Sequence, residues 1–84
     1  MPYFVVYILE CSDGTYYTGS TDNLKERLEA HNSGHGARYT RGRRPVRLVW
    51  FAECATRREA MRRERELKCM PVSEKMKLAH HKSS

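Results

Sequence analysis

The sequence lacks any apolar run long enough to span a membrane, and its first residues lack the basic and apolar segments of a secretory signal. Its three cysteines, Cys11, Cys54 and Cys69, are odd in number and have no C-x-x-C spacing, which argues against a disulfide framework and a zinc site. No phosphate-binding loop, dinucleotide fingerprint or serine-hydrolase elbow is present. These absences favour a reduced, cytoplasmic protein without membrane contact.

Acidic residues are absent from residues 30–52, a stretch that contains five arginines. Over all 84 residues, 16 Lys and Arg outnumber 10 Asp and Glu, for a formal net charge of +6. Arginine is the commoner cation, and its planar guanidinium makes bidentate contacts with phosphate. The composition is compatible with a phosphate-rich partner such as nucleic acid, or with a merely soluble basic surface.

The first residues predict a β-hairpin. Aromatic and β-branched residues over 3–10 indicate a strand, and a second strand is expected over 15–19. Asp13-Gly14 between them is typical of a type I′ turn, in which both central residues have positive φ. Tyr7 and Tyr17 therefore lie on adjacent antiparallel strands.

A helix is predicted over 22–32. Asn23 and Glu26 have the spacing of a capping box, and Gly34 is the expected C-terminal stop. Leu24, Leu28 and His31 share one face of this helix. Residues 33–45 show no periodicity and predict a long, mobile basic loop.

The remaining sequence predicts a strand over 46–53, a helix over 56–69, a short helix from Ser73 and a frayed tail over 80–84. The expected fold class is α+β, with a three-stranded, largely antiparallel sheet flanked by helices. We expect one domain over 1–84, with its core over about 3–69.

Glu64 is the most anomalous residue of the second long helix, because it shares an apolar stripe with Ala60, Met61 and Leu67. A carboxylate on such a stripe is costly unless it is paired or binds a metal ion. One interpretation is an ion pair with an arginine such as Arg27. The other is a metal ligand, since carboxylate oxygens suit Mg²⁺ or Mn²⁺.

Four further side chains are candidates for chemistry. Arg27 edges the apolar face of its helix, either as a surface residue or as a group that binds a phosphate. Tyr7 and Tyr17 are either core residues or proton carriers whose pKa a cation lowers. His31 is either structural, or it assists proton transfer or holds a tyrosine hydroxyl.

The basic loop is a candidate nucleic-acid surface. Cations can follow a phosphate backbone, and an interleaved tyrosine can stack on an unpaired base, while the alternative is a solvated loop. The candidate nucleic-acid-binding residues are Arg38, Tyr39, Arg41, Arg43, Arg44 and Arg47.

The two strands carry segments that resemble the two halves of the motif of GIY-YIG nucleases. These segments are Val5-Val6-Tyr7 and Tyr17-Thr18-Gly19, with Gly19 as the conformationally important residue of the second half. The departures are Val5 for the first Gly, Thr18 for Ile and Ser20 for a lysine that repair excinucleases often carry. A downstream asparagine that some members use has no evident counterpart.

The helices continue this resemblance, which covers about residues 3–69. Arg27 lies where the family has its helix arginine, His31 where it has Tyr or His, and Glu64 where it has its metal-binding glutamate. The sequence is most similar to small stand-alone bacterial GIY-YIG proteins that consist of the nuclease domain alone.

The resemblance implies a nuclease with one divalent metal ion, Mg²⁺ or Mn²⁺, held by Glu64. It also implies that Arg27 contacts the scissile phosphate and that a tyrosine, here Tyr7 supported by Tyr17, activates water. The expected activity is endonucleolytic cleavage of DNA rather than RNA, single-stranded or branched, with weak sequence specificity. The alternatives are a non-catalytic nucleic-acid-binding module and a nuclease subunit that needs a protein partner.

Overall fold

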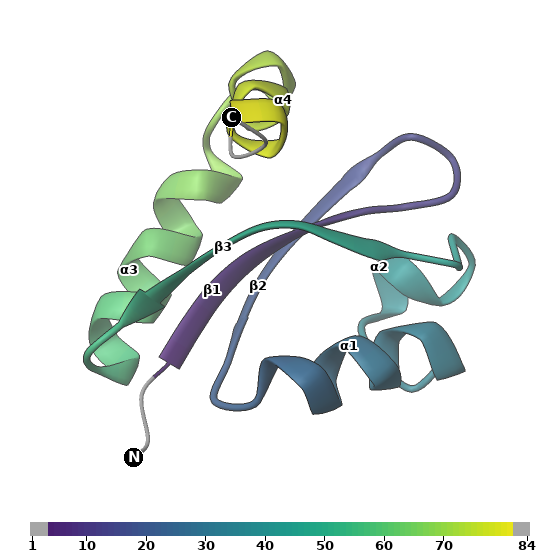
Figure 1. Ribbon diagram of the computed structural model, residues 1–84, viewed down its shortest axis with the longest axis horizontal. Coiled ribbons are helices and arrows are strands. Elements are labelled where there is room, and N and C mark those ends of the chain that lie inside the picture. Colours follow the sequence, from purple (N-terminus) through teal and green to yellow (C-terminus); the bar gives the residue numbers. More distant parts are fainter. Residues whose placement is uncertain (1–3, 82–84) are drawn as a thin grey trace.

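The computed structural model describes the backbone of residues 4–81 and the side chains of residues 4–78 (Figure 1). Three strands form one antiparallel sheet in the order β2-β1-β3. Within these residues four helices complete the fold, whose α+β class is the one that the sequence predicted. The elements are β1 (Phe4–Glu10), β2 (Tyr16–Thr21), α1 (Leu24–Ser33), α2 (Arg38–Arg41), β3 (Arg47–Cys54), α3 (Arg57–Lys68) and α4 (Val72–His81).

The central strand β1 is buried on both faces of the sheet. Val6 and Ile8 point to one face, where they pack with Ala60 and Leu67 of α3. Alternate residues point to the other face, where Leu24 and Leu28 of α1 cover them. A strand covered on both sides has no solvent-facing positions, which explains why its sequence is a continuous apolar run.

The helices consequently form two layers with the sheet between them. Figure 1 shows α3 on one side of β1, with α1 and α2 on the other, and α4 beyond the far end of α3. Strands β2 and β3 are the two edges of the sheet. Within the described residues, no helix is both long and apolar enough to cross a membrane.

The hairpin turn differs from the predicted type. Gly14 has a φ of +86°, but no residue other than glycine has a positive φ among those described, so Asp13 does not adopt the type I′ conformation. The amide of Gly14 donates to the Cys11 carbonyl at 3.0 Å, and the amide of Cys11 donates to the Thr15 carbonyl at 2.8 Å. The loop is therefore one residue longer, with a left-handed glycine at its end.

The helices α1 and α3 are both capped by a side chain at their N-termini, and the cap of α1 is the one that the sequence predicted. The Asn23 side chain accepts from the Glu26 amide at 3.1 Å, and the Thr56 side chain accepts from the Glu59 amide at 3.1 Å. Gly34 ends α1 with a φ of +91°, in the left-handed region that favours glycine.

The structure differs from the predicted secondary structure in two segments. The segment expected to be a loop contains α2, whose Thr40 is fully buried, because four residues are too few to show a helical period. The last helix begins at Val72 and continues to His81, so the frayed tail expected from residue 80 is helical up to that point. Residues 82–84 of the predicted tail lie outside the described residues.

Asn32 joins the end of α1 to the start of β3. Its side-chain amide donates to the Val46 carbonyl at 3.0 Å, and its side-chain carbonyl accepts from the Val46 amide at 2.7 Å. Val46 is 4% exposed, so its backbone groups depend on this side chain for hydrogen bonds. The Asn32 side chain therefore makes the two hydrogen bonds to the Val46 amide and carbonyl that the backbone of a neighbouring strand would otherwise make.

Replacing this side chain should destabilise the fold. We expect Asn32→Ala to lower the free energy of unfolding by roughly 2 kcal/mol, because two hydrogen bonds of about 1 kcal/mol each are lost. Urea denaturation measures the change. Asn23→Ala is the matched control, since it removes one hydrogen bond at the other end of the same helix. A loss no larger than that of the control would contradict the clamping role.

Candidate active site

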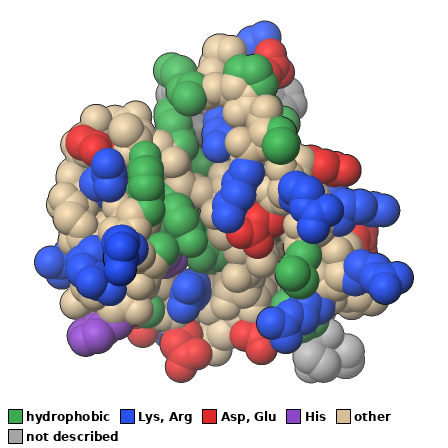
Figure 2. Space-filling view, turned by 180° about the vertical axis from the view of Figure 1, so that it is seen from behind, with side chains coloured by type: hydrophobic (Ala, Val, Ile, Leu, Met, Phe, Trp, Pro, Cys, Tyr) green, Lys and Arg blue, Asp and Glu red, His purple; other side chains and the backbone are tan. Residues whose placement is uncertain are grey.

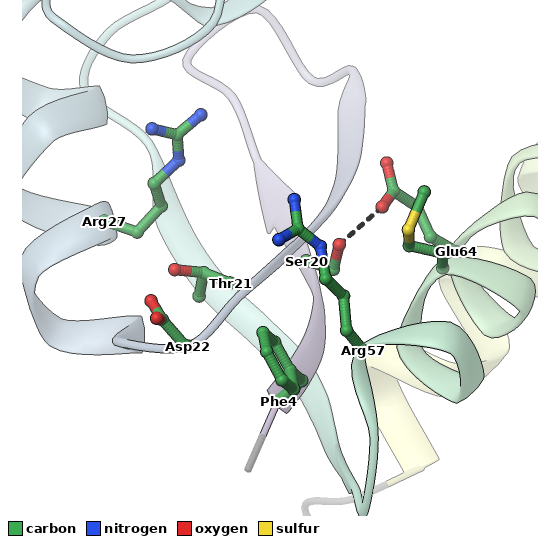
Figure 3. Close-up of a pocket in the computed structure, with 8 residues that line it drawn as sticks. Phe4, Ser20, Thr21, Asp22, Arg27, Arg57 and Glu64 are labelled. Atoms are coloured by element: carbon green, nitrogen blue, oxygen red, sulfur yellow. Dashed lines mark hydrogen bonds between the residues drawn. The ribbon is translucent and has the colours of Figure 1, made fainter. Parts of the chain in front are cut away.

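A cavity of about 340 Å³ lies beside the edge strand β2 (Figure 3). Side chains from β1, β2, α1 and α3 contribute to its wall, so residues distant in sequence meet there. Arg27 reaches it from α1, and Arg57 and Glu64 reach it from α3. The full lining is Phe4, Ser20, Thr21, Asp22, Arg27, Arg57, Met61 and Glu64.

Glu64 holds a defined position in this wall. Its Oε1 accepts from the Ser20 hydroxyl at 2.6 Å, and its Oε2 pairs with Lys68 Nζ at 3.0 Å. The side chain is 21% exposed. The predicted ion pair with Arg27 is therefore replaced by one with Lys68, which lies one helical turn further along α3.

The helix face that Glu64 shares with Ala60, Met61 and Leu67 is only partly buried. Ala60 and Leu67 are buried, but Met61 is 51% exposed at the rim of the cavity. Glu64 thus lies at the boundary between core and solvent, which is where a carboxylate can bind a ligand without full desolvation.

Arg27 and Arg57 place two guanidinium groups at the same cavity from opposite layers of the fold (Figure 3). Both residues are exposed, and neither makes an ion pair within the part of the chain that the structure describes. Guanidinium groups in this arrangement suit a phosphate, which can accept several charge-assisted hydrogen bonds.

Tyr7 explains why Gly19 is a glycine. The two residues are paired in the β1–β2 register, and the Tyr7 ring lies across the backbone of its partner. A Cβ on Gly19 would lie 2.6 Å from the Tyr7 hydroxyl oxygen and 2.8 Å from Cζ. Only a residue without a side chain leaves room for the phenol at this position.

The Tyr7 hydroxyl begins a buried chain of hydrogen bonds. It lies 3.0 Å from Nε2 of His31, and Nδ1 of His31 lies 2.8 Å from Oγ1 of Thr40. Thr40 in turn donates its single hydroxyl proton to the Ala37 carbonyl at 3.0 Å. Tyr7, His31 and Thr40 are at most 1% exposed.

This chain determines the tautomer of His31. Because the Thr40 proton is used on Ala37, the Thr40 oxygen must accept from His31, and Nδ1 therefore carries the imidazole proton. Nε2 of the neutral ring is then unprotonated and accepts from the Tyr7 hydroxyl. Tyr7 is thus a hydrogen-bond donor to a base.

The pKa values agree with this neutral pair. Burial raises the pKa of the Tyr7 phenol to about 12, although the neighbouring Arg27 guanidinium acts to lower it. Burial, and to a smaller extent the positive charge of Arg27, lowers the pKa of His31 below its usual 6.5. Both groups are therefore uncharged near neutral pH.

Tyr17 lies beside this pair but is more accessible. Its ring centroid is 6.5 Å from that of Tyr7 and 5.2 Å from that of His31, and the residue is half-buried. The structure therefore brings both tyrosines and His31 into one cluster, while Arg27 and Glu64 line the neighbouring cavity.

The predicted nucleic-acid-binding residues divide into two sets. Arg43 pairs with Asp13 at 3.0 Å and lies 4.0 Å from the Tyr39 ring centroid, Arg44 donates to the Arg41 carbonyl, and Arg47 pairs with Glu10. The side chains of Arg38 and Arg41 are exposed and make no ion pair within the described residues.

Several residues at the site had not been identified as site residues from the sequence. Ser20 was noted only as a departure from a family pattern, and Arg57 was one of many helix arginines. Gly36 had no assigned role, yet a Cβ there would lie 2.7 Å from the Cα of His31. Thr40 carried no sequence signal, because a threonine in a basic segment is unremarkable.

The metal donors at the site are few. Within the described residues, no three His, Cys, Asp or Glu side chains are grouped so that they could hold a metal ion. Glu64 is the carboxylate that the edge of the sheet and α3 position together. Mg²⁺ is commonly bound by one or two carboxylates, with water and substrate phosphate completing its shell, so Glu64 fits this kind of site.

Comparison with known proteins is consistent with this geometry. The family described as the GIY-YIG catalytic domain matches residues 3–75. A UPF0213 protein of Clostridium perfringens is 50% identical over 93% of this chain and 84% of its own length. A UPF0213 protein of Halobacterium salinarum is 50% identical over 83% of this chain and 91% of its own length.

Two solution NMR structures have a similar fold. A UPF0213 protein from Bacillus halodurans has a TM-score of 0.57 and 47% identity, and the match covers 93% of this chain and 82% of that one. A protein from E. faecalis has a TM-score of 0.60 and 37% identity, over 87% of this chain and 78% of that one.

The tautomer of His31 should depend on Thr40. In Thr40→Val the hydroxyl that accepts from Nδ1 is lost, so we expect the ¹⁵N signals of His31 to shift away from the Nδ1–H tautomer. Thr40→Ser keeps the hydroxyl and should retain the wild-type pattern. Unchanged ¹⁵N shifts in a folded Thr40→Val protein would contradict the assignment.

The lowered pKa of His31 makes stability depend on pH. As the pH falls below about 6.5, the unfolded chain gains a proton that the folded chain gains only at lower pH, so the free energy of unfolding should decrease. Urea denaturation at pH 7.5, 6.5 and 5.5 tests this. The decrease should be smaller in His31→Gln, whereas His35→Gln, at an exposed site, should behave as wild type.

Proposed function

The chain belongs to the GIY-YIG family of catalytic domains and to its UPF0213 proteins, and we propose that it is a metal-dependent endonuclease that hydrolyses phosphodiester bonds in DNA. One observation carries the proposal. Two arginines and one ordered glutamate, from helices on opposite faces of the sheet, line a single cavity at its edge.

Arg27 and Arg57 would bind the scissile phosphate. Both guanidinium groups line the cavity, and binding from two sides would orient the phosphate toward Glu64. Positive charge held at this point stabilises the negative charge that develops on the phosphate oxygens in the transition state. Orientation by groups on two helices also limits the motion of the reacting phosphate.

Glu64 would hold the divalent metal ion, Mg²⁺ or Mn²⁺. The hydrogen bond from Ser20 fixes Oε1 and orients the carboxylate. Lys68 is paired with Oε2 and is the cation that a metal ion must replace or share. When bound, the metal supplies Lewis-acid stabilisation of the leaving oxygen.

Tyr7 and His31 would accept the proton of the attacking water. A phenol with a pKa of about 12 is a poor base if it must first ionise alone. In this arrangement Tyr7 can pass its proton to Nε2 of His31 as it takes one from water, so no free phenolate is needed. Tyr17, which is more exposed, would position the water near the phenol.

The exposed Arg38 and Arg41 would contact the DNA backbone beyond the cleavage site. Such contacts carry no sequence information, because all phosphates are alike. The small domain therefore favours cleavage with weak sequence specificity, in DNA that is single-stranded or branched.

The activity is tested with end-labelled single-stranded, duplex and branched DNA in Mg²⁺, Mn²⁺ or EDTA. We expect metal-dependent cleavage, and we expect Glu64→Gln to reduce it by about a hundredfold or more, because the loss of the metal ligand removes several kcal/mol of transition-state stabilisation. The variant keeps the size of the side chain and an oxygen that can accept from Ser20.

Glu66→Gln is the matched control, since it neutralises an exposed carboxylate on the same helix. It should cleave as wild type does. Cleavage that persists in Glu64→Gln would remove Glu64 from the mechanism. Binding of DNA without cleavage in any metal would favour a nucleic-acid-binding module or a subunit that needs a partner.

A further inference from the structure

A second cavity, of about 260 Å³, opens on the other side of Lys68 from Glu64. It is lined by residues of β2, α2, α3 and α4, namely Tyr16, Tyr17, Thr18, Tyr39, Lys68 and Lys75. Lys68 and Tyr17 also belong to the surroundings of the candidate active site. The two cavities are therefore neighbours along the edge of the sheet.

One face of the molecule carries hydrophobic and basic side chains next to each other. In Figure 2 a band of hydrophobic side chains runs down the face that is seen from behind, with basic side chains gathered on both sides of it. Tyrosines count among the hydrophobic side chains in that view. An apolar band between cations suits a ligand that is itself flat and apolar in one part and anionic in another.

Lys75 is the residue of this cavity that indicates an anionic ligand. The residue is half-buried and makes no ion pair within the part of the chain described. Its ammonium shares the cavity with that of Lys68, and burial together with the charge of Lys68 lowers the pKa of Lys75. Lys68 is already paired with Glu64, so Lys75 is the lysine of this cavity whose charge has no anion beside it among the described residues.

The other wall of the cavity is aromatic. The rings of Tyr17 and Tyr39 are stacked, with their centroids 6.0 Å apart and an interplanar angle of 26°. The Arg43 guanidinium lies over the Tyr39 ring, 4.0 Å from its centroid, so one face of this ring contacts Arg43 and the other faces Tyr17. Thr18 also lines the cavity. This residue is 3% exposed, and its hydroxyl has no hydrogen-bond partner within the described residues.

We propose that this cavity binds one unpaired nucleotide next to the scissile phosphate, with its phosphate between Lys68 and Lys75 and its base against the tyrosine rings. Aromatic side chains bind unpaired bases through their faces, which neighbouring bases cover in a duplex. On Tyr39 the base would take the place of the Arg43 guanidinium, whose side chain is 38% exposed. The position relative to the scissile phosphate rests on the proposed nuclease function. The binding itself does not, because it requires neither metal nor cleavage.

Binding is tested in EDTA with a fluorescent oligothymidylate, at several salt concentrations, using the full chain. Lys75→Met should weaken binding and reduce the slope of log affinity against log salt by about 0.7, the value for one phosphate contact on a single strand. Lys77→Met is the matched control, because it removes an equal charge from an exposed position on the same helix. It should leave both quantities unchanged.

The aromatic wall is tested in the same assay. Tyr39→Leu keeps an apolar side chain but removes the ring, and should weaken binding roughly 5- to 150-fold, the range for loss of one stacked base. Phe51→Leu, which changes an exposed aromatic residue on β3, should bind as wild type. An oligouridylate of equal length distinguishes DNA from RNA as the source of the nucleotide.

The structure of each variant is checked by its amide NMR spectrum, in which wild-type signals from the cavity should shift on titration with the oligonucleotide. Lys75→Arg, which keeps the charge, should restore binding. Equal losses in Lys75→Met and Lys77→Met, or equal binding of blunt duplex and single strand, would overturn the subsite. Binding that depends on Lys75 without any cleavage would retain the subsite and reject the nuclease. Metal-dependent cleavage together with binding that Lys75→Met leaves unchanged would retain the nuclease and reject the subsite.

Discussion

A chain of buried hydrogen bonds through His31 connects the parts of the molecule from which the candidate active site is built. It runs from Tyr7 in β1, through the imidazole in α1 and Thr40 in α2, to the carbonyl of Ala37. Buried polar groups are costly unless each donor meets an acceptor, and every donor in this chain has one. These hydrogen bonds hold β1, α1 and α2 together, and they also leave the unprotonated Nε2 of His31 facing the Tyr7 phenol.

The position of β2 at the edge of the sheet is the second constraint. A side chain in the middle of a sheet can meet the helices on one face only, whereas an edge is open to both layers. Ser20 contacts Glu64 of α3, and Arg27 of α1 reaches the same cavity from the other layer. The groups of the candidate active site can converge because, within the described residues, no further strand lies beside β2 on that side of the sheet.

Charge is distributed unevenly over this framework. Arg43 and Arg47 pair with acidic residues at the turn of the β1–β2 hairpin, Asp13 and Glu10, and so contribute to the fold. Each exposed ion pair of this kind adds little stability. The pairing nevertheless makes these two arginines less available to a ligand than their neighbours, a difference that the sequence does not reveal. Arg38 and Arg41 keep their charge available at the surface, and Lys68 stands between the two cavities, paired with Glu64.

The sequence by itself determined the fold class, the strands and the helix caps. Asn23 and Gly34 are recognisable because a cap is satisfied within a few residues along the chain. It also pointed to Glu64, since a carboxylate interrupts an apolar period. Only the tertiary structure decided that Ser20 would hold that carboxylate and that Thr40 would set the tautomer of a histidine. These contacts join residues that become neighbours only when the helices pack on the sheet, and no local pattern records which side chains then lie within hydrogen-bonding distance.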